Sequence, residues 1–412
     1  MVSAPVPGVG SIAFGLYFPT GSRDETRDSN GISHFLEHLL FKGTPSRTVD
    51  QINREIDLLG GASNAFTSKE VLCFHARVLS EHLSRLTGLF GDLASNGLGE
   101  GVPGLAEQVR RERAVILQEI SAVEDSPEDL VDQLADHSFF GDHPLALPVV
   151  GSAAAVARLE LPQLRQHLRR HLGARKMVVA ASGAVEHEEL VARVREDFDG
   201  LEQGDPLAKL PPAEHRPLGR FAARDIEQVH VTLSAPGLAQ ADPDREAAEL
   251  LSMVFGEGVS SRLFREVRER RGLAYSIYSS LASYCDSGSF NVSFAVAPPK
   301  LEETLEVVGG VLRSGRDGEL LEAELEVAKQ HYRASLVLAH DSPGGRMAHI
   351  ASQALAGIDD LGIEGTLAAV DRVTVDDLTR LASRFLSRPL SLAAVGPVRE
   401  SEALAGGWEI GP

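Results

Sequence analysis

The first part of the chain alternates between strand-like and helix-like hydrophobic patterns. Ile12, Phe14, Leu16 and Phe18 recur at every second position, which predicts a strand over 11–18. Downstream, the patterns predict a helix over 30–42 that ends at Gly43 and Pro45, a helix over 47–60, extended chain over 62–77, a helix over 81–94, and a long helix over 105–135 that breaks near Pro127.

The second part of the chain repeats this organisation after a proline-rich stretch. Residues 201–219 contain four prolines and little periodicity, so we place a linker over 204–219. Beyond it, alternating apolar residues predict a strand near 229–233 and further strands over 275–297. A shift of 214 residues superimposes Leu164, Arg170, Leu172 and Ala180 on Leu378, Arg384, Leu386 and Ala394.

Each copy in this repeat is an amphipathic helix that runs into a hydrophobic strand. The repeat predicts an α+β protein with two homologous domains, 1–203 and 220–412. Each domain should contain a mostly antiparallel sheet packed with helices. Two copies are too few for a solenoid, which needs three or more.

Composition narrows the classes of function. The chain has 40 Lys plus Arg against 59 Asp plus Glu, a net charge of −19, which disfavours nucleic acid as a partner. No stretch approaches the ~18 consecutive apolar residues of a membrane span. The N-terminal residues lack the basic region of a signal peptide. We therefore expect a soluble, cytoplasmic protein with no membrane partner. The distant Cys73 and Cys285 should be reduced, partly buried thiols.

The segment His34-Phe35-Leu36-Glu37-His38 carries the clearest chemistry in the sequence. Residues four apart lie on one face of a helix, so both imidazoles can reach a single ion, with Glu37 beside it. This is the inverted H-x-x-E-H arrangement of zinc peptidases. A second pair, His167 and His171, has the same spacing but lies among arginines without an acid, and we expect a solvated helix face there.

A third ligand is needed, because catalytic zinc usually takes three protein ligands and leaves one position for water. The long helix offers Glu112, Glu119 and Glu124. Glu112 and Glu119 are two turns apart and share a face with apolar residues, and a buried carboxylate normally requires a partner or a metal. The spacing does not choose among these three acids.

Several motifs together resemble the pitrilysin (insulinase) family of zinc metallopeptidases. The matching segments, in family order over nearly the whole chain, are GISHFLEHLLFKGT, GGASNAFTSKE, ERAVILQEISAVEDSPED and FGEGVSSRLFREVRERRGLAYSIYS. The length resembles the small, two-domain, processing-peptidase-like branch. The resemblance implies a zinc-dependent endopeptidase.

The resemblance also implies roles for particular residues. Glu119 corresponds to the third zinc ligand and Glu112 to an acid that supports the site. Asn64 and Ala65 correspond to an edge strand that binds substrate backbone. Arg268 and Tyr275 correspond to a pair that binds substrate near the scissile bond; without the resemblance we would interpret them as a surface charge and a strand residue.

Two features depart from the family pattern. Eighty residues separate His38 from Glu119, a few more than is usual, and we attribute the excess to the loop GLGEGVPG. Glu124 is the alternative ligand if this interpretation is wrong. The chain also begins about one strand late, so either its start is misassigned or one sheet edge differs.

The expected site is one Zn²⁺ per chain, held by His34, His38 and Glu119, with Glu37 as the general base. Arg268 or Tyr275 would stabilise the oxyanion. Because this chain carries both the zinc motif and the Arg268–Tyr275 pair, we expect a homodimer. The resemblance implies that the second domain of one subunit can face the zinc domain of the other across an enclosed chamber, which would restrict substrates to peptides or unfolded segments. The alternatives are a heterodimer subunit that needs a related partner and a non-catalytic scaffold. A carboxyl group of residue 119 that points away from the histidines, with no other acid in its place, would contradict the hydrolase prediction.

Overall fold

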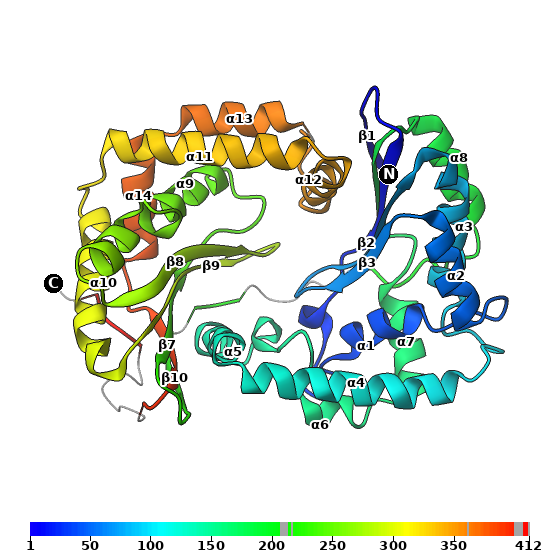
Figure 1. Ribbon diagram of the computed structural model, residues 1–412, viewed down its shortest axis with the longest axis horizontal. Helices are drawn as coiled ribbons and strands as arrows, with labels where there is room; N and C mark the ends of the chain where they lie inside the picture. Colours follow the sequence, from blue (N-terminus) through cyan, green and yellow to red (C-terminus); the bar gives the residue numbers. More distant parts are fainter. Residues whose placement is uncertain (207–212, 216, 361, 399–406, 411–412) are drawn as a thin grey trace. The chain divides into compact units, whose positions relative to one another are not determined.

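The computed structural model describes residues 1–206, 213–215, 217–360, 362–398 and 407–410 (Figure 1). The chain forms two compact units, one from 1–122, 147–210 and 338–361 and the other from 123–146, 211–337 and 362–412. In the predicted linker over 204–219, residues 207–212 and 216 lie outside the described residues.

The first unit contains a five-stranded sheet in the order β1-β5-β2-β4-β3. Its strands are β1 (Val2–Pro5), β2 (Ser11–Phe18), β3 (Ala62–Thr67), β4 (Leu72–Leu79) and β5 (Val178–Gly183). The β1–β5 pair is parallel and the other pairs are antiparallel. Its helices are α1 (Ile32–Leu40), α2 (Val49–Leu59), α3 (Leu83–Asn96), most of α4 (Leu105–Asp125), α6 (Ala153–Val156), α7 (Leu161–His171), α8 (His187–Asp197) and α12 (Pro343–Leu355).

The second unit repeats this sheet, in the order β6-β10-β7-β9-β8, with only the β6–β10 pair parallel. Its strands are β6 (Gly219–Ala223), β7 (Val229–Pro236), β8 (Ala274–Ser283), β9 (Gly288–Val296) and β10 (Ser391–Gly396). Its helices are α5 (Pro127–Phe140), α9 (Arg245–Gly256), a π-helical turn over Phe264–Glu269, α10 (Leu301–Arg316), most of α11 (Glu322–His340), α13 (Ile363–Arg372) and α14 (Val375–Phe385).

The predicted fold class and repeat are confirmed. Helix α7 leads into β5, and α14 leads into β10, with α14 placed 375 − 161 = 214 residues after α7. Each of these helix–strand pairs puts its strand second in its sheet, next to the short parallel strand. The repeat in sequence therefore reflects two copies of one topology.

Strand β2 is buried on both faces. Ile12, Phe14, Leu16 and Phe18 enter the main core, as their alternation predicts. The opposite face carries Ala13, Gly15 and Tyr17 and lies under α12, where Met347, Ile350 and Ala351 complete a second core. A Cβ on Gly15 would lie 3.2 Å from the Met347 Sδ, so the small residue permits this close packing.

In two places the chain passes from one unit to the other between consecutive helices. Helix α5 follows α4 but packs on β10, β7 and β6 of the second unit, through Val131 and Ala135 against Ala393 and Val395. Helix α12 follows α11 but packs on β5, β2 and β1 of the first unit. The predicted domains, 1–203 and 220–412, follow chain order without such an exchange, and their boundaries stay a prediction.

The expectation that the chain begins about one strand late is wrong to the extent that a strand does precede Ser11. Strand β1 occupies Val2–Pro5 and pairs in parallel with β5 at the sheet edge. Its four residues are too few for an alternating pattern, and an edge position tolerates Pro5.

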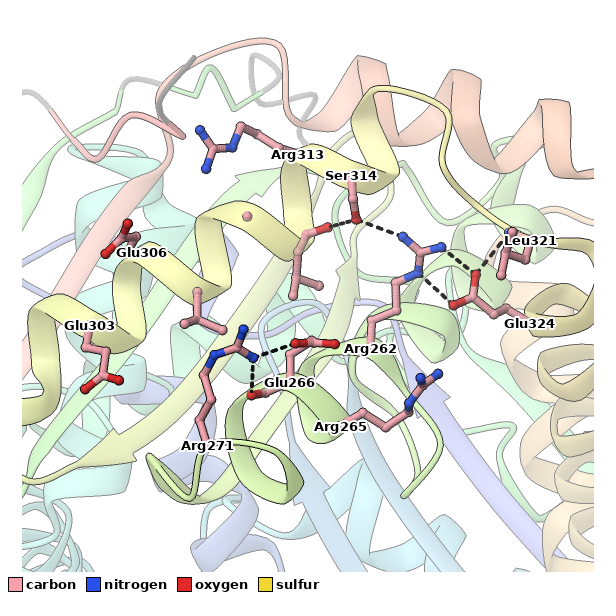
Figure 2. A pocket seen from close by; sticks show the side chains of 13 residues that line it. Arg262, Arg265, Glu266, Arg271, Glu303, Glu306, Arg313, Ser314, Leu321 and Glu324 are labelled. Carbon is pink, nitrogen blue, oxygen red and sulfur yellow. Dashed lines mark hydrogen bonds and ion pairs between the residues drawn. The ribbon is translucent and has the colours of Figure 1, made fainter.

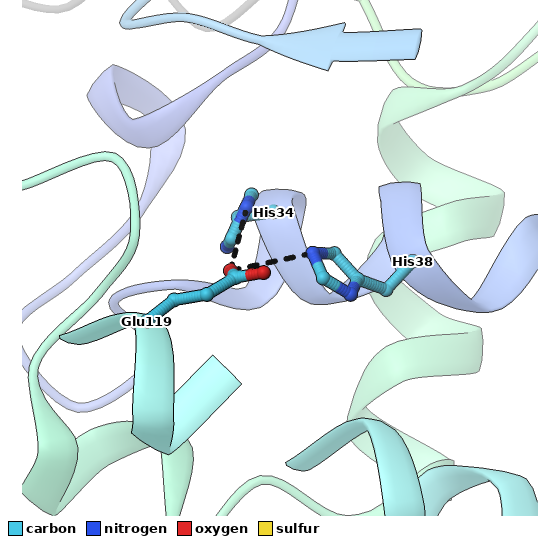
Figure 3. A group of neighbouring side chains, drawn as sticks. All are labelled: His34, His38 and Glu119. Carbon is cyan, nitrogen blue, oxygen red and sulfur yellow. Dashed lines mark ion pairs between the residues drawn. The ribbon is translucent and has the colours of Figure 1, made fainter. Parts of the chain in front are cut away.

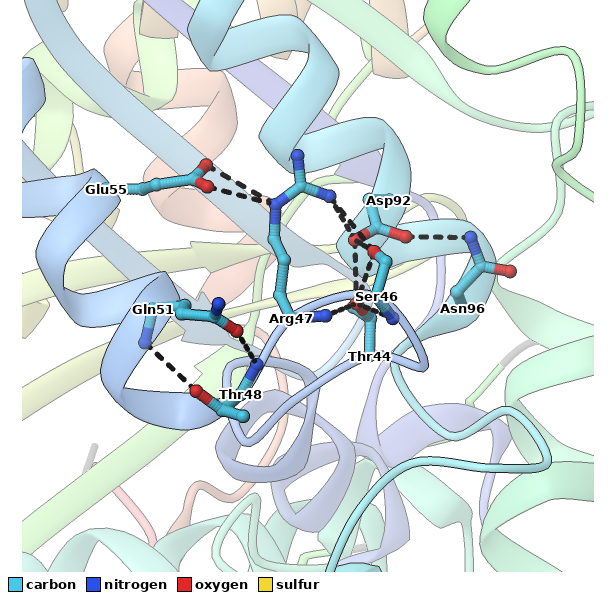
Figure 4. A network of polar contacts seen from close by, with 8 residues as sticks. All are labelled: Thr44, Ser46, Arg47, Thr48, Gln51, Glu55, Asp92 and Asn96. Carbon is cyan, nitrogen blue, oxygen red and sulfur yellow. Dashed lines mark hydrogen bonds and ion pairs between the residues drawn. The ribbon is translucent and has the colours of Figure 1, made fainter.

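The segment between α1 and α2 is held by a polar network (Figure 4). The Arg47 guanidinium bonds Asp92 at 2.5 Å and Glu55 at 3.3 Å, and Asp92 also accepts bonds from Thr44, Ser46 and Asn96. Burial alone would raise the pKa of Asp92, but these hydrogen bonds lower it. The network fixes the chain where it leaves α1.

Within the described residues, no helix combines the length and apolar character needed to cross a bilayer.

Candidate metal centre

Helix α1 orients the H-x-x-E-H segment because its apolar face is buried. Phe35, Leu36 and Leu39 are fully buried in the first core. His34 and His38 therefore project from the opposite face, and their ring centroids lie 4.7 Å apart.

Glu119 on α4 completes a group of three candidate metal ligands (Figure 3). Its Oε2 lies 3.7 Å from the His34 Nε2 and 3.6 Å from the His38 Nε2. These separations are long for hydrogen bonds. With metal–ligand bonds of about 2.0–2.2 Å, two ligands of a tetrahedral zinc ion lie roughly 3.4 Å apart. The two histidines and the carboxylate therefore fit a zinc ion, and the Glu119 carboxyl group points toward the histidine pair.

Glu112 and Lys42 surround His38 on the side away from Glu119. The Glu112 Oε2 lies 3.1 Å from the His38 Nδ1, and the Lys42 Nζ lies 2.8 Å from the other Glu112 oxygen. A carboxylate that accepts the Nδ1–H bond leaves the Nε2 lone pair available for a metal. The His34 Nδ1 is buried and, among the described residues, has no hydrogen-bond partner.

The electrostatics of α1 suit a metal site with a nearby base. Burial and the neighbouring His38 lower the pKa of His34 to about 4, so its imidazole is neutral at pH 7, as a metal ligand must be. Burial raises the pKa of Glu37, while a hydrogen bond from Thr67 and the proximity of His38 act against this rise. A carboxylate with a raised pKa is a better proton acceptor at neutral pH.

Strand β3, which carries Asn64 and Ala65, lies at the edge of the first sheet. Its only partner among the described strands is β4. The Ala65 N–H bonds the Asn64 Oδ1 at 2.9 Å. Thr67, two residues beyond Ala65 and on the same face, donates a 2.6 Å hydrogen bond to the Glu37 Oε2. Thr67 thus connects the open edge strand β3 directly to the candidate base Glu37.

Arg268 and Tyr275 lie together in the second unit. The Arg268 guanidinium carbon is 4.6 Å from the Tyr275 ring centroid and 4.7 Å from that of Phe264. The π-helical turn that contains Arg268 leads into β8, which carries Tyr275 with 79% of its surface exposed. The two side chains form a cation–π pair open to solvent.

The prediction of a solvated face for His167 and His171 is wrong for His167. Its side chain is buried, its Nε2 lies 3.2 Å from the Ser33 Oγ, and its ring stacks on that of His171. The arginines in the sequence pointed to solvent, but α7 turns this histidine toward α1. Glu124, the alternative ligand, is exposed and is not in the metal-ligand group.

A pocket of about 670 Å³ lies in the second unit and contains none of these ligand residues (Figure 2). Its charges are mostly matched. Arg262 bonds Glu324 at 2.6 Å and Ser314 at 2.8 Å, and Arg271 bonds Glu266 at 2.5 Å. The pocket has no free cluster of one charge that would select a ligand.

The sequence patterns did not identify Thr67 and Lys42 as site residues, although each contacts a candidate site residue. Their spacing from other site residues could have indicated both. Lys42 follows His38 by four residues, and Thr67 follows Ala65 by two, which places it on the same strand face.

Sequence comparison finds two family matches in this chain. Residues 2–153 match the insulinase family (peptidase family M16), and residues 158–332 match the peptidase M16 inactive domain. Outside the first unit's motif, no H-x-x-E-H segment occurs in the sequence. The second match is thus a related domain without the metal-binding motif.

Curated relatives cover nearly the whole chain. An uncharacterized zinc protease of Mycobacterium bovis is 40% identical over 96% of this chain and 91% of its own length. One from Streptomyces coelicolor is 38% identical over 98% and 88%. One from Bacillus subtilis is 30% identical over 95% and 94%.

Solved structures share the fold at lower identity. A peptidase M16 inactive domain from Pseudomonas fluorescens matches 97% of this chain and 96% of its own, with a TM-score of 0.89 and 20% identity. A protease from Helicobacter pylori matches 95% and 96%, with a TM-score of 0.87 and 21% identity.

Proposed function

This chain belongs to the insulinase family of peptidases (family M16), and from that premise we propose that it is a zinc-dependent endopeptidase. The observation that carries the proposal is the group formed by His34, His38 and Glu119, whose ligand atoms all lie within 4.8 Å of one another. The relatives named as zinc proteases support the choice of metal.

The residues around this group take distinct roles in the proposal. A zinc ion there would supply Lewis acidity that polarises a peptide carbonyl and acidifies water. Glu37, held by Thr67, accepts the proton of the attacking water and returns it to the leaving amine. Glu112 orients His38.

Substrate binding is assigned to two further places. Backbone groups of β3 at Asn64 and Ala65 bind an extended peptide by strand addition. Arg268 and Tyr275 bind near the scissile carbonyl and stabilise the developing negative charge. Strand addition requires extended chain, so we propose peptides and unfolded segments as substrates.

The assembly we propose is a cytoplasmic homodimer that encloses its substrates in a chamber, with one zinc ion per chain. A single chain carries both the zinc motif and the Arg268–Tyr275 pair, so no residue of this set has to come from a different protein.

The alternatives are a heterodimer subunit or a non-catalytic scaffold. The word "inactive" in the description of the second-half match is the observation that favours a scaffold. Against it, His34, Glu37, His38 and Glu119 have no evident structural use together.

The decisive experiment incubates the zinc-loaded protein, alone, with a diverse peptide mixture and reads the products by mass spectrometry. Internal cleavage that disappears after chelation and returns with zinc is the expected result. Zinc binding without cleavage would contradict the endopeptidase proposal and favour a scaffold. Cleavage only after addition of a related chain would favour the heterodimer.

A further inference from the structure

The short segment 20–25 contacts both the metal-binding helix α1 and the β3–β4 hairpin. We propose that Arg23 and Glu25 in this segment are positioning residues for the peptidase reaction: Glu25 places α1, and Arg23 places the strand that receives substrate. The inference rests on the proposed function. The contacts of Arg23 and Glu25 that carry it go to residues other than the candidate metal ligands.

Glu25 caps the N-terminus of α1 although it lies six residues before Gly31 in the chain. Helix α1 begins after Gly31, which has no side chain to cap it. The Glu25 carboxylate instead accepts bonds from the Gly31 N–H at 2.7 Å and the Ser33 N–H at 2.8 Å. It also accepts one from the Asn30 side chain at 2.9 Å. The two backbone bonds satisfy N–H groups that the start of a helix leaves unpaired, at the end where a negative charge is favoured.

Burying the Glu25 carboxylate is energetically unfavourable, and we infer that the bonds it makes to α1 are the reason for its position. Only 3% of its surface is exposed, and burial raises its pKa to about 7 although four hydrogen bonds act to lower it. An exposed Ser, Thr, Asp or Asn at the cap would stabilise a helix more cheaply. The buried carboxylate bonds the residue directly before His34, so it fixes the start of the turn that presents both histidines.

Arg23 holds the turn between β3 and β4. Its guanidinium bonds Glu70 at 2.5 Å, and its backbone N–H bonds the Lys69 carbonyl at 2.8 Å. Gly21 permits this contact, because a Cβ there would lie 2.2 Å from the Ser68 carbonyl oxygen. The segment is therefore packed against the hairpin through backbone and side chain together.

A direct hydrogen bond also joins the β3–β4 hairpin to α1, at a position between these two attachments. Thr67, the last residue of β3, bonds Glu37 on α1. Segment 20–25 holds the hairpin just beyond Thr67 and holds α1 one turn before Glu37. Two connections, the Thr67–Glu37 hydrogen bond and segment 20–25, thus set the spacing between the open strand edge and the candidate base. A small shift at a reacting centre lowers the rate strongly.

The test compares Glu25→Gln and Arg23→Lys with Asp28→Asn as the control, because Asp28 follows the same segment with its side chain 97% exposed. Zinc affinity is measured by chelator competition, and kcat and KM with a fluorogenic peptide. Glu25→Gln should weaken zinc binding about tenfold and lower kcat, with KM nearly unchanged. Arg23→Lys should raise KM about fivefold and leave zinc affinity unchanged. Asp28→Asn should change neither.

Equal losses in every parameter, or a lower melting temperature alone, would show a merely structural role and overturn the inference. If Glu25→Gln does not fold, Glu25→Asp, which keeps the charge but is one methylene shorter, should show the same zinc defect. An inactive parent protein would contradict the proposed function instead. Zinc affinity and amide exchange in α1 and the β3–β4 hairpin would then still test the inference. Glu25→Gln should loosen only α1, and Arg23→Lys only the hairpin.

Discussion

At the scale of single residues, Glu37 has a hydrogen bond that orients it and an environment that raises its pKa, without belonging to the ligand group. We expect Glu37→Gln to retain zinc and to lose about 10²–10⁴-fold in peptidase activity, because Gln cannot accept the water proton. Zinc content and kcat/KM measure the two effects. Glu124→Gln is the matched control, since Glu124 is an exposed glutamate on the same helix as Glu119. An active, metal-loaded Glu37→Gln would exclude Glu37 as the base.

Lys42 supports the site through Glu112. Its ammonium group lies 2.8 Å from the carboxylate that orients His38. Lys42→Met keeps most of the side chain but removes the charge, and Glu112 then loses a partner that holds it in place. We expect zinc affinity to fall about tenfold, within the range for residues that support metal ligands. Lys300→Met, which breaks an exposed pair with Glu303, should leave zinc affinity unchanged.

The site residues differ in how far the sequence could predict them. His34, Glu37 and His38 are local in the chain, and a helical spacing of three and four residues brings them together. Glu119 lies far from the two histidines in the sequence, and helical periodicity did not distinguish it from Glu112 and Glu124 as the third ligand. Only the family resemblance selected it, because spacing within α4 says nothing about which turn of that helix faces α1.

At the scale of elements, the buried His167 makes α7 sensitive to acid. Burial lowers the pKa of His167 to about 3, whereas an unfolded histidine titrates near 6.5. Between these values the unfolded chain binds a proton that the folded chain does not, so stability falls as the pH falls from 6.5 toward 3. We expect this residue to contribute a loss of about 2 kcal/mol between pH 7 and pH 5.

Urea unfolding of the wild type and His167→Gln at pH 5 and pH 7 tests this expectation. The variant should lose less stability than the wild type over this interval. His187→Gln, which replaces an exposed histidine of α8, should behave as the wild type does. The same pH dependence in all three proteins would exclude His167 as the cause.

The elements themselves were largely predictable where patterns are long. Helices α1, α2, α3 and α4 and strand β2 lie where their hydrophobic periodicity predicts them. Strand β1 was missed because four residues with a proline carry no alternation. The sheets on which α5 and α12 pack could not be predicted either. An amphipathic pattern shows that a helix has an apolar face but not which sheet covers that face.

At the scale of the whole molecule, α4 and α11 each extend past the limit of one compact unit. Helix α4 carries Glu119 three residues before its assignment changes after position 122. The candidate ligand is therefore covalently continuous with α5, which packs in the second unit's sheet. A two-domain interpretation in which each half of the sequence folds alone would separate α5 and α12 from the sheets they cover. The full chain is the appropriate protein for every experiment proposed above.

The proposed homodimer makes one prediction that no single-chain enzyme shares. In this dimer, as the family resemblance implies, Arg268 and Tyr275 of one subunit would serve the zinc site of the other. Glu37→Gln and Arg268→Ala should each be inactive alone, yet in a mixed dimer one site regains both an intact base and an intact arginine. Random exchange of subunits should restore about a quarter of wild-type activity.

The measurement is peptide hydrolysis before and after the two purified variants are mixed and allowed to exchange. The control mixes Glu37→Gln with the double variant Glu37→Gln/Arg268→Ala, which cannot form a complete site in any pairing. Restored activity in the first mixture alone would establish that subunits share the site, because each subunit supplies what the other lacks. Verified mixed dimers that remain inactive would contradict sharing and assign Arg268 to the zinc site of its own chain.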